Sequence, residues 1–381
     1  MYLPNIFVDA RYIRRGMSGV GIYVYNILKS LAEILPTQKI TALFLKDEVP
    51  QDFKVIPNID WIETDVDYEN HIKNEIWENT TLVKIAKQKK TDIFFGPAFL
   101  IPWVKTPFKK VVTIHDFIAD KFPQNYTFLF RHYIRIITRL SSKFADAIIA
   151  VSENTKKACT EIVKVHPNKI KVIYEAPSPI FKPLTQEEKL GFPINLPTPF
   201  ILFVGNLEPR KNLITLVKGF EIAIEKYNIP HHLVIIGKIH KNSREIIAYL
   251  RKSKILSQRI HIIPYVEMEK IVFYYNSAEM FIFPSKYEGF GLPPLEAMAC
   301  GLPVISSNID VEKEILGDSA AFFDVGDAEQ LAALMVKIYR DEEFRNNLKE
   351  RGLNHSKSFS WETSASKIFK LFIGLMESNS Y

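Results

Sequence analysis

The sequence predicts an α/β protein with two doubly wound parallel-sheet domains. Short apolar runs rich in β-branched and aromatic residues alternate with segments of helical periodicity along most of the 381 residues. Most of these runs are apolar at consecutive positions, which indicates parallel strands that helices cover on both faces. The alternation pauses once, at 176–199, where six prolines are typical of a linker.

The predicted strands divide evenly between the two halves of the chain. In the first half we expect strands at 6–10, 39–45, 91–96, 110–116, 146–152 and 169–175. In the second half we expect them at 199–205, 232–237, 260–265, 280–285, 302–307 and 320–325. Helical segments such as 21–35 and 212–227 fall between the strands, and the tail is also helical in pattern.

The domain boundaries follow from this pattern. Residues 1–180 are expected to form a first Rossmann-like domain, 181–198 a linker, and 199–358 a second Rossmann-like domain. Ligands bind such sheets at the carboxyl ends of the strands. We therefore expect both sets of strand ends to face a shared cleft.

The composition is that of a soluble globular protein, with 47% hydrophobic and 24% charged residues. The two cysteines, Cys159 and Cys300, argue against a disulfide framework or a zinc site and fit a reducing cytoplasm. Asp9 and Arg11 interrupt any apolar core of a signal peptide. No apolar run approaches the roughly 18 residues of a membrane span, so a cytoplasmic location is expected.

The net charge of +6 lies in the first half of the chain, chiefly at 101–150. This segment has eight basic and three acidic residues. An anionic substrate or an anionic membrane surface accounts for such a modest excess as well as nucleic acid does. We predict no nucleic-acid partner.

Residues 287–301, YEGFGLPPLEAMACG, follow a predicted strand and lead into a predicted helix. Gly289 and Gly291 allow the backbone to approach a ligand, and a helix N-terminus attracts an anion. Glu288 and Glu296 lie on either side, where carboxylates can accept hydrogen bonds from sugar hydroxyls. The ligand this pattern predicts is a nucleotide sugar, with a diphosphate between two hydroxyl-rich rings. The alternative is an ordinary strand–turn–helix with a pair of surface glutamates.

A pair of cations, Arg210 and Lys211, follows the first strand of the second domain, which ends at Gly205. Two fixed cations at the carboxyl end of a strand suit a diphosphate whose leaving charge must be stabilised. The alternative is a solvated surface pair, but its position after that strand favours the site.

The chain resembles the retaining glycosyltransferases of family 4 in three segments: GNLEPRKN (205–212), VIIGK (234–238) and YVEMEKIVFYYNSAEMFIFPSKYEGFGLPPLEAMACGLPVISSN (265–308). The resemblance is most specific across about 200–330 and looser before it. It implies the GT-B fold of two Rossmann-like domains, the first for the acceptor and the second for the nucleotide-sugar donor, with the last helix, about 359–381, crossing back to complete the first.

The resemblance also implies a set of donor-binding residues. It implies that Glu288 contacts the donor sugar, that Glu296 contacts the ribose, and that Arg210 and Lys211 hold the diphosphate. Backbone near the base and around the phosphates completes the implied donor site: Gly205, Tyr265, Val266, Gly289, Phe290, Gly291 and Leu292.

The first half contains further matches to the family. SGVGIYVYNIL (18–28) resembles its glycine-rich loop, where Gly19 and Gly21 would let the backbone close over the donor phosphates. VVTIHDF (111–117) resembles the strand that ends in a His-Asp pair, which implies that His115 faces the transferred sugar. The alternative for His115 is a structural residue at a strand end. Ser152 and Glu153 are expected to start a helix nearby.

One pattern suggests a metal site and is rejected. Asp65 and Asp67 form the Asp-x-Asp motif of the other main glycosyltransferase fold, but they lie in an acidic loop with no suitable strand before it. Because Arg210 and Lys211 can supply the positive charge, we expect neither a metal nor any other cofactor.

Four bases recur at every fourth residue of a predicted helix: Arg131, Arg135, Arg139 and Lys143. On a helix this spacing gives one basic stripe, with apolar neighbours beside it. The stripe indicates either a solvated face or a patch for anionic lipid headgroups or a lipid diphosphate.

The resemblance implies transfer of a hexose with retention of configuration. We expect front-face attack, because no carboxylate is placed as a nucleophile. GDP-mannose is the first choice of donor, since the His-Asp segment is similar to that of bacterial mannosyltransferases of surface polysaccharide synthesis. The acceptor is a glycan or a lipid-linked glycan, and docking on the inner face of the plasma membrane is one expectation. The alternatives are a UDP-sugar-dependent enzyme of the same family, another enzyme of this fold, and a non-catalytic binding subunit.

Overall fold

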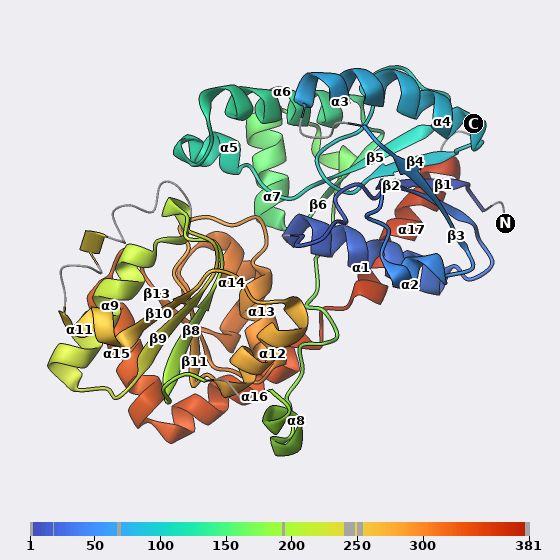
Figure 1. Ribbon diagram of the computed structural model, residues 1–381. Helices are drawn as coiled ribbons and strands as arrows, with labels where there is room; N and C mark the ends of the chain where they lie inside the picture. The colour runs from blue at the N-terminus through green and yellow to red at the C-terminus, as the bar shows by residue number, and fades with distance from the viewer. Residues whose placement is uncertain are drawn as a thin grey trace. The chain divides into compact units, whose positions relative to one another are not determined.

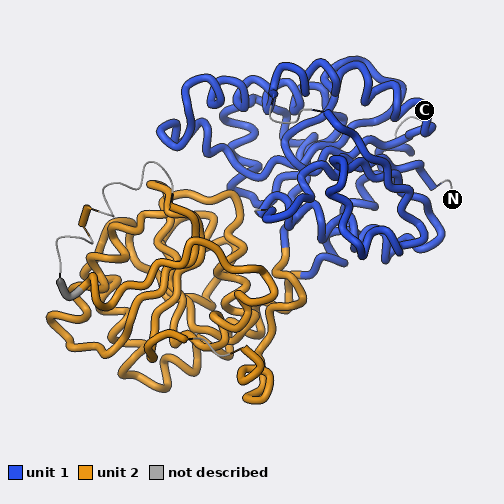
Figure 2. The backbone as a smooth tube through the Cα atoms, in the orientation of Figure 1, with its two compact units in different colours: residues 1–175, 360–381 blue, residues 176–359 orange. Residues whose placement is uncertain are grey.

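The computed structural model describes residues 3–17, 19–66, 70–192, 195–239, 248–249 and 254–377. The chain forms two compact units, residues 1–175 with 360–381 and residues 176–359 (Figure 2). The segment expected as a linker belongs to the second unit and contains the short helix α8 (Gln186–Leu190). Two hydrogen bonds fix this segment to α12 (Met268–Ser277). The Asn276 side chain accepts from the Leu184 N–H at 2.8 Å and donates to the Lys182 carbonyl at 3.0 Å.

The first unit contains a seven-stranded parallel sheet in the order β3-β2-β1-β4-β5-β6-β7 (Figure 1). Its strands are β1 (Ile6–Asp9), β2 (Ile40–Leu45), β3 (Ile59–Thr64), β4 (Ile93–Gly96), β5 (Lys109–Ile114), β6 (Ala147–Ala150) and β7 (Ile170–Val172). All six expected strands are present. The sequence missed β3, because this edge strand is half exposed and therefore has no continuous apolar run.

Helices cover the sheet of the first unit on both faces (Figure 1). They are α1 (Gly19–Ile34), α2 (Gln51–Lys54), α3 (His71–Trp77), α4 (Val83–Gln88), α5 (Ile118–Lys121), α6 (Phe128–Phe144), α7 (Glu153–Ala158) and α17 (Trp361–Glu377). The C-terminal helix α17 packs against α1, as expected of a tail that returns to the first domain. Ser364 Oγ fixes its start by donating to the Tyr174 carbonyl at 2.6 Å.

The second unit contains a six-stranded parallel sheet in the order β10-β9-β8-β11-β12-β13. Its strands are β8 (Phe200–Val204), β9 (His232–Ile236), β10 (Ile260–Ile263), β11 (Met280–Phe283), β12 (Val304–Ser307) and β13 (Ala321–Phe323). With α8, the described helices are α9 (Leu213–Tyr227), α11 (Lys254–Arg259), α12 (Met268–Ser277), α13 (Leu292–Ala299), α14 (Asp310–Leu316), α15 (Ala328–Arg340) and α16 (Glu342–Ser356).

The central strands form the core of each unit. Every residue of β1, β4 and β6 is buried in the first unit, and the same is true of β11 and β12 in the second. Burial of an aliphatic or aromatic side chain contributes about 1.5–3 kcal/mol, so these short strands supply much of the driving force for folding. The prediction of strands covered on both faces is confirmed.

The two sheets share one topological feature that positions ligands. In each, the chain builds outward from one strand and then returns to that strand's other side, so the strand order reverses there. The reversal falls between β1 and β4 in the first unit and between β8 and β11 in the second. Loops leave the two strands in opposite directions at such a point, which opens a crevice beyond their carboxyl ends.

Candidate active site

An ion cluster fills the strand-order reversal of the second unit. Arg210 and Lys211 lie on a short 3-10 turn after β8, and Glu288 lies on the loop after β11. Glu288 Oε1 is 2.7 Å from Arg210 Nη1 and 2.8 Å from Lys211 Nζ. A second acid, Glu208, holds Arg210 Nε at 2.9 Å. Arg210 Nη1 also donates to the Tyr287 carbonyl, 77 residues further along the chain. The loops after β8 and β11 therefore meet here.

The cluster is buried, and this determines its electrostatics. Burial alone would raise the pKa of the Glu288 carboxyl, but the charges of Arg210 and Lys211 lower it to about 2. Burial lowers the pKa of the Lys211 ammonium, while the Glu288 carboxylate opposes that shift. The Lys211 Nζ also lies 4.4 Å from the centre of the Phe283 ring. The Glu288 carboxylate is thus ionised and pairs with both cations beyond the end of β8.

Glu296 lies in the middle of α13 and is almost completely buried. Its Oε2 accepts a hydrogen bond of 3.0 Å from the hydroxyl of Tyr275, on α12. Burial raises the pKa of the Glu296 carboxyl to about 7, against the opposing effect of that hydrogen bond. Near neutral pH this side chain therefore exists in both protonation states, and only the charged form is a pure acceptor.

Gly291 is the N-cap of α13 and adopts a left-handed conformation with φ of 101°. A Cβ at this position would lie 2.7 Å from Glu312 Oε1, so only glycine fits the turn. Pro293 and Pro294 occupy the first turn and have no N–H, so they supply no backbone donor there. The positive end of the helix dipole remains.

Glu312 is a residue that the sequence analysis missed. It lies on α14, is fully buried, and accepts a hydrogen bond of 3.1 Å from Ser306 Oγ. Burial, followed by the nearby Glu288 charge, raises its pKa well above the ordinary value. No local motif marks it, because its position beneath Gly291 depends on the packing of α14 against the sheet.

The remaining expected donor residues occupy two loops of the second unit. Tyr265 and Val266 lie between β10 and α12, where the Tyr265 ring is exposed and Lys238 Nζ lies 5.8 Å from its centre. Gly289 and Phe290 lie between β11 and α13, with Phe290 packed edge-on against Phe359. Gly205 directly follows β8, and Leu292 begins α13.

His115 follows β5 in the first unit and is buried. Its Nε2 donates to the Pro97 carbonyl at 2.8 Å, and its Nδ1 lies 3.0 Å from Glu175 Oε1. Both ring nitrogens of His115 therefore have partners within the first unit. The contact of His115 with the transferred sugar stays a prediction. The sequence analysis missed Glu175, although an acid at the carboxyl end of a predicted strand was a usable signal.

The glycine-rich segment opens α1. A Cβ on Gly21 would lie 2.6 Å from Met17 Cβ and 2.7 Å from the Tyr12 carbonyl, so close packing requires this glycine. Gly19 meets nothing within 4 Å. Ser152 caps α7 by accepting from the Thr155 N–H at 3.0 Å, and Glu153 begins that helix as expected.

The basic stripe on α6 is less continuous than its sequence suggested. Asp120, on α5, lies 2.7 Å from Arg135 Nε and 3.6 Å from Arg139 Nη2, so its one negative charge pairs with two of the four bases. Because Asp120 precedes the helix in sequence, the spacing of the four bases does not by itself reveal this pairing. Of the other two bases, Arg131 lies over the Phe128 ring at 5.4 Å and Lys143 is exposed.

The described part of the chain contains neither a cluster of metal-binding side chains nor a helix that could span a membrane. Asp65 directly follows β3, a strand that the rejection of the Asp-x-Asp motif did not foresee, and Asp67 lies outside the described residues. No group of three metal-binding side chains occurs among the residues described. Over the same residues, none of the helices combines the length and hydropathy needed to cross a bilayer.

Comparison with known families agrees with this architecture unit by unit. The family described as "Glycosyltransferase Family 4" matches residues 17–176, and that described as "Glycosyl transferases group 1" matches residues 185–355. The chain belongs to the family 4 glycosyltransferases of the GT-B type. Sucrose-phosphate synthase from Thermosynechococcus elongatus has the same fold, with a TM-score of 0.80 at 20% identity over 98% of this chain and 100% of that one.

Curated relatives of this glycosyltransferase include two mannosyltransferases of Escherichia coli. The serotype-specific mannosyltransferase WbdA is 30% identical over 287 residues, or 73% of this chain and 35% of that protein. The chain thus matches about a third of the length of this relative. The O-antigen chain mannosyltransferase B is 27% identical over 286 residues, which is 74% of each chain. The chain is therefore a glycosyltransferase related to O-antigen mannosyltransferases.

Proposed function

We propose that this glycosyltransferase transfers a hexose from a nucleotide sugar to a glycan acceptor, with retention of anomeric configuration and without a metal ion. GDP-mannose is the first choice of donor, because two relatives are named as mannosyltransferases. The proposed pathway is the synthesis of a surface polysaccharide, as in the O-antigen proteins to which the chain is similar. A UDP-linked sugar is the alternative donor.

The observation that carries the proposal is the buried ion cluster at the β8–β11 reversal. A carboxylate that pairs with two cations costs desolvation energy, and replacing such a cluster with apolar residues is often neutral or stabilising. A binding role explains why the chain keeps it. The two cations, held by Glu288 and Glu208, suit the diphosphate of the donor.

In this mechanism, the chain acts by positioning and electrostatics. Arg210 and Lys211 stabilise the negative charge that develops on the leaving diphosphate as the glycosidic bond breaks. The acceptor hydroxyl attacks the same face of the anomeric carbon, and its proton passes to an oxygen of the leaving phosphate. Glu296 accepts hydrogen bonds from the ribose, and Glu288 holds the cations and contacts the donor sugar.

Retention and metal independence rest on the same residues. Double displacement requires a carboxylate nucleophile beneath the anomeric carbon. Glu288 is a poor candidate, because Arg210 and Lys211 already contact its Oε1. A metal ion usually neutralises the leaving diphosphate, and here the two cations can take that role.

The proposal is tested by incubating the enzyme with a panel of nucleotide sugars and following thermal unfolding. A donor at 100 times its dissociation constant stabilises the protein by about 2.7 kcal/mol. We expect GDP-mannose to give the largest shift, with and without a chelator. Proton NMR of the transferred sugar should show the anomeric configuration of the donor. Failure of every nucleotide sugar to bind would contradict the proposal.

A lipid-linked acceptor would bring the enzyme to a membrane surface. We keep peripheral docking through α6 as a hypothesis, motivated by Arg131 and Lys143 beside the exposed Phe128, Leu129 and Phe144. Because Asp120 pairs with Arg135 and Arg139, the expected attraction to anionic lipid is weaker than four free bases would give.

A further inference from the structure

The first unit has a cavity of its own at the reversal between β1 and β4. Its volume is about 400 Å³, within the roughly 300–1,000 Å³ of small-molecule sites. Tyr12 and Arg14 follow β1, and Leu100 follows β4, so the cavity opens beyond the carboxyl ends of both strands. The other lining residues come from α3 and α6: His71, Asn74, Phe130, Tyr133 and Ile134.

The walls of the cavity are aromatic. The His71 and Tyr133 rings stack with centres 4.3 Å apart and planes 16° from parallel. Phe130 packs beside both, with its centre 5.2 Å from His71 and 6.2 Å from Tyr133. Flat rings that carry a polar atom present both an apolar face and a hydrogen-bonding edge. A pyranose ring has the complementary form, with C–H groups on its faces and hydroxyls around its edge.

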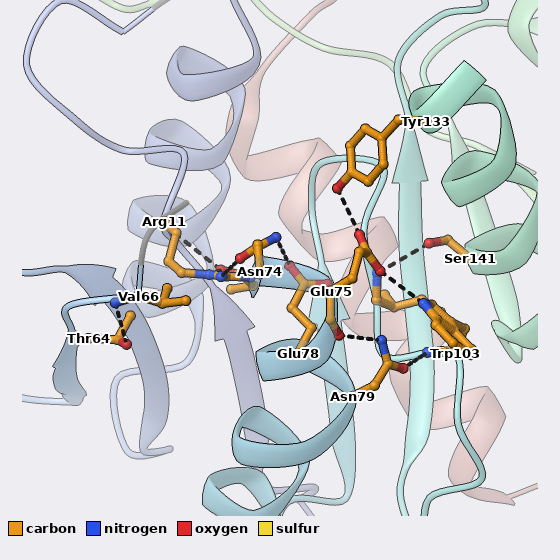
Figure 3. Close-up of polar contacts among 12 residues, drawn as sticks. Arg11, Thr64, Val66, Asn74, Glu75, Glu78, Asn79, Trp103, Tyr133 and Ser141 are labelled. Carbon is orange, nitrogen blue, oxygen red and sulfur yellow. Dashed lines mark hydrogen bonds and ion pairs between the residues drawn. The ribbon is translucent and has the colours of Figure 1, made fainter. Parts of the chain in front are cut away.

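A network of buried polar contacts holds α3 in place and so fixes one wall of the cavity (Figure 3). The fully buried Arg11 donates from Nη1 to Asn74 Oδ1 at 2.7 Å and from Nη2 to Glu78 Oε1 at 2.6 Å. Arg11 is in turn held by Asp9 at the end of β1. Since Asn74 itself lines the cavity, this network ties the site directly to the strand end.

Glu75, on the same helix, connects α3 with α6 and with the segment after β4 (Figure 3). Its Oε1 accepts from the Tyr133 hydroxyl at 2.7 Å, and its Oε2 accepts from Trp103 Nε1 at 2.9 Å. Trp103 belongs to the segment after β4, and Tyr133 belongs to α6. Residues from three separate segments thus hold the Tyr133 ring at a fixed angle, which is the preorganisation that a binding site requires.

The charge of the lining decides which ligand it fits. Among the described residues that line the cavity, Arg14 is the only formally charged one, and none of them is an acid. A diphosphate requires more positive charge than Arg14 alone supplies, such as that of the pair Arg210 and Lys211. An isoprenyl chain would bury the polar groups of His71 and Arg14 without satisfying them.

We propose that this cavity binds a sugar ring of the acceptor, stacked against Tyr133 and Phe130. The inference rests on the proposed function, because it assigns the acceptor of that reaction to a saccharide. His71 and Arg14 supply hydrogen bonds to its hydroxyls, while Asn74 is held by Arg11 and Glu78. Tyr133 and Phe130 therefore determine acceptor affinity, while Glu75 is a positioning residue that holds the Tyr133 ring.

The test is saturation-transfer NMR on the full chain with methyl α-D-mannopyranoside. Irradiating the aromatic protons should transfer magnetisation to the C–H protons of the sugar. Tyr133→Ala and Phe130→Ala should each weaken binding about tenfold, the effect of losing one stacked ring. Tyr133→Phe keeps the ring but loses the hydrogen bond to Glu75, so it should weaken the signal less than Tyr133→Ala does.

Leu129→Ala is the matched control, because Leu129 is an exposed apolar residue of the same helix that does not line the cavity. It should bind the glycoside as wild type does. If the alanine variants unfold, Ile134→Trp provides a second test, since it fills the cavity from a half-buried position and should abolish the signal.

Three outcomes overturn the inference: no transfer to the glycoside in wild type, undiminished transfer in folded Tyr133→Ala and Phe130→Ala, or a Tyr133-dependent signal from geranyl diphosphate in place of the glycoside. Binding of nucleotide sugars by the same sample separates the two proposals. Glycoside binding without donor binding would refute the proposed function alone. Donor binding without glycoside binding would refute this site alone.

Discussion

The two units place a crevice at the same point of the same sheet topology, yet the side chains in the two crevices differ in kind. In the second unit, Arg210, Lys211 and Glu288 form a buried cluster of charges. In the first unit, the lining is aromatic, and the charged residue Arg11 lies behind the wall, fully buried. The fold therefore determines where a ligand can bind, and the loops after the strands determine which ligand binds.

The difference also shows how each unit uses a buried arginine. Arg210 is held by Glu208 and Glu288 at the mouth of the strand ends, where a ligand's phosphates can add to the pairing. Arg11 contacts Asp9, Asn74 and Glu78. In these contacts its role is structural. Burial of a cation is thus no evidence of a ligand site by itself.

The largest expected effect comes from removing the charges of the second crevice. Arg210→Ala combined with Lys211→Ala should lower kcat by at least about 10²–10³-fold, the usual cost of losing one preorganised group beside a developing anion. Steady-state transfer assays with the preferred donor measure it. Lys349→Ala combined with Arg351→Ala removes the same charge from exposed positions on α16 and is the control. Equal activity of the two double variants would contradict a catalytic role for the charges in the second crevice.

Glu296→Gln should weaken nucleoside diphosphate binding by about 1–3 kcal/mol, because the ribose hydroxyls lose a charged acceptor. The loss should depend on pH, since the pKa of Glu296 is raised to about 7. Above pH 7 the wild-type carboxylate accepts fully, and the two proteins should differ most. Below pH 6 the difference should shrink. A calorimetric titration at several pH values measures it, and a difference that does not change with pH would contradict the assignment.

The same shift predicts how stability changes with pH. A carboxyl whose pKa is higher in the folded state binds a proton more tightly there, so its contribution is full below about 4.3, the unfolded value, and is lost as pH rises to 7. Relative to wild type, Glu296→Gln should therefore gain stability as pH rises through this window. Denaturant unfolding of both proteins from pH 4.5 to 8 checks this prediction.

Gly291→Ala should destabilise the protein by about 1–3 kcal/mol, because its φ of 101° and its contact with Glu312 both exclude a side chain. Gly374→Ala is the contrasting change. It lies within α17 with no atom near the new Cβ, and alanine there should stabilise the helix by about 0.5–1 kcal/mol. Thermal unfolding measures both, and a neutral Gly291→Ala would show that the turn tolerates repacking.

The smallest expected effect concerns the membrane. Each base near an anionic surface contributes about 1 kcal/mol, so Arg131→Ala with Lys143→Ala should reduce sedimentation with anionic vesicles at low salt. Salt should abolish the binding of wild type as well. If wild type ignores such vesicles at low salt, the α6 face is ordinary solvated surface.

Much of the architecture could be predicted from the sequence because buried parallel strands are apolar on both faces. Twelve expected strands coincide with strands of the structure, whereas β3 escaped because it is a half-exposed edge strand. The partners of the site residues were harder to foresee. Tyr275 reaches Glu296, and Asp120 reaches Arg135, only through packing between helices. The aromatic cavity was missed altogether, since its residues come from four segments with no shared motif.

Hydrogen exchange of the full chain with each ligand tests most directly the claim that the two crevices bind different chemistry. With GDP-mannose, and with UDP-glucose as the alternative donor, amide protection should rise in 205–213 and 285–297 of the second unit. With methyl α-D-mannopyranoside, it should rise in 70–79 and 128–137 of the first unit and leave 205–213 unchanged. Protection of 128–137 by the nucleotide sugar, with none in 205–213, would contradict the account.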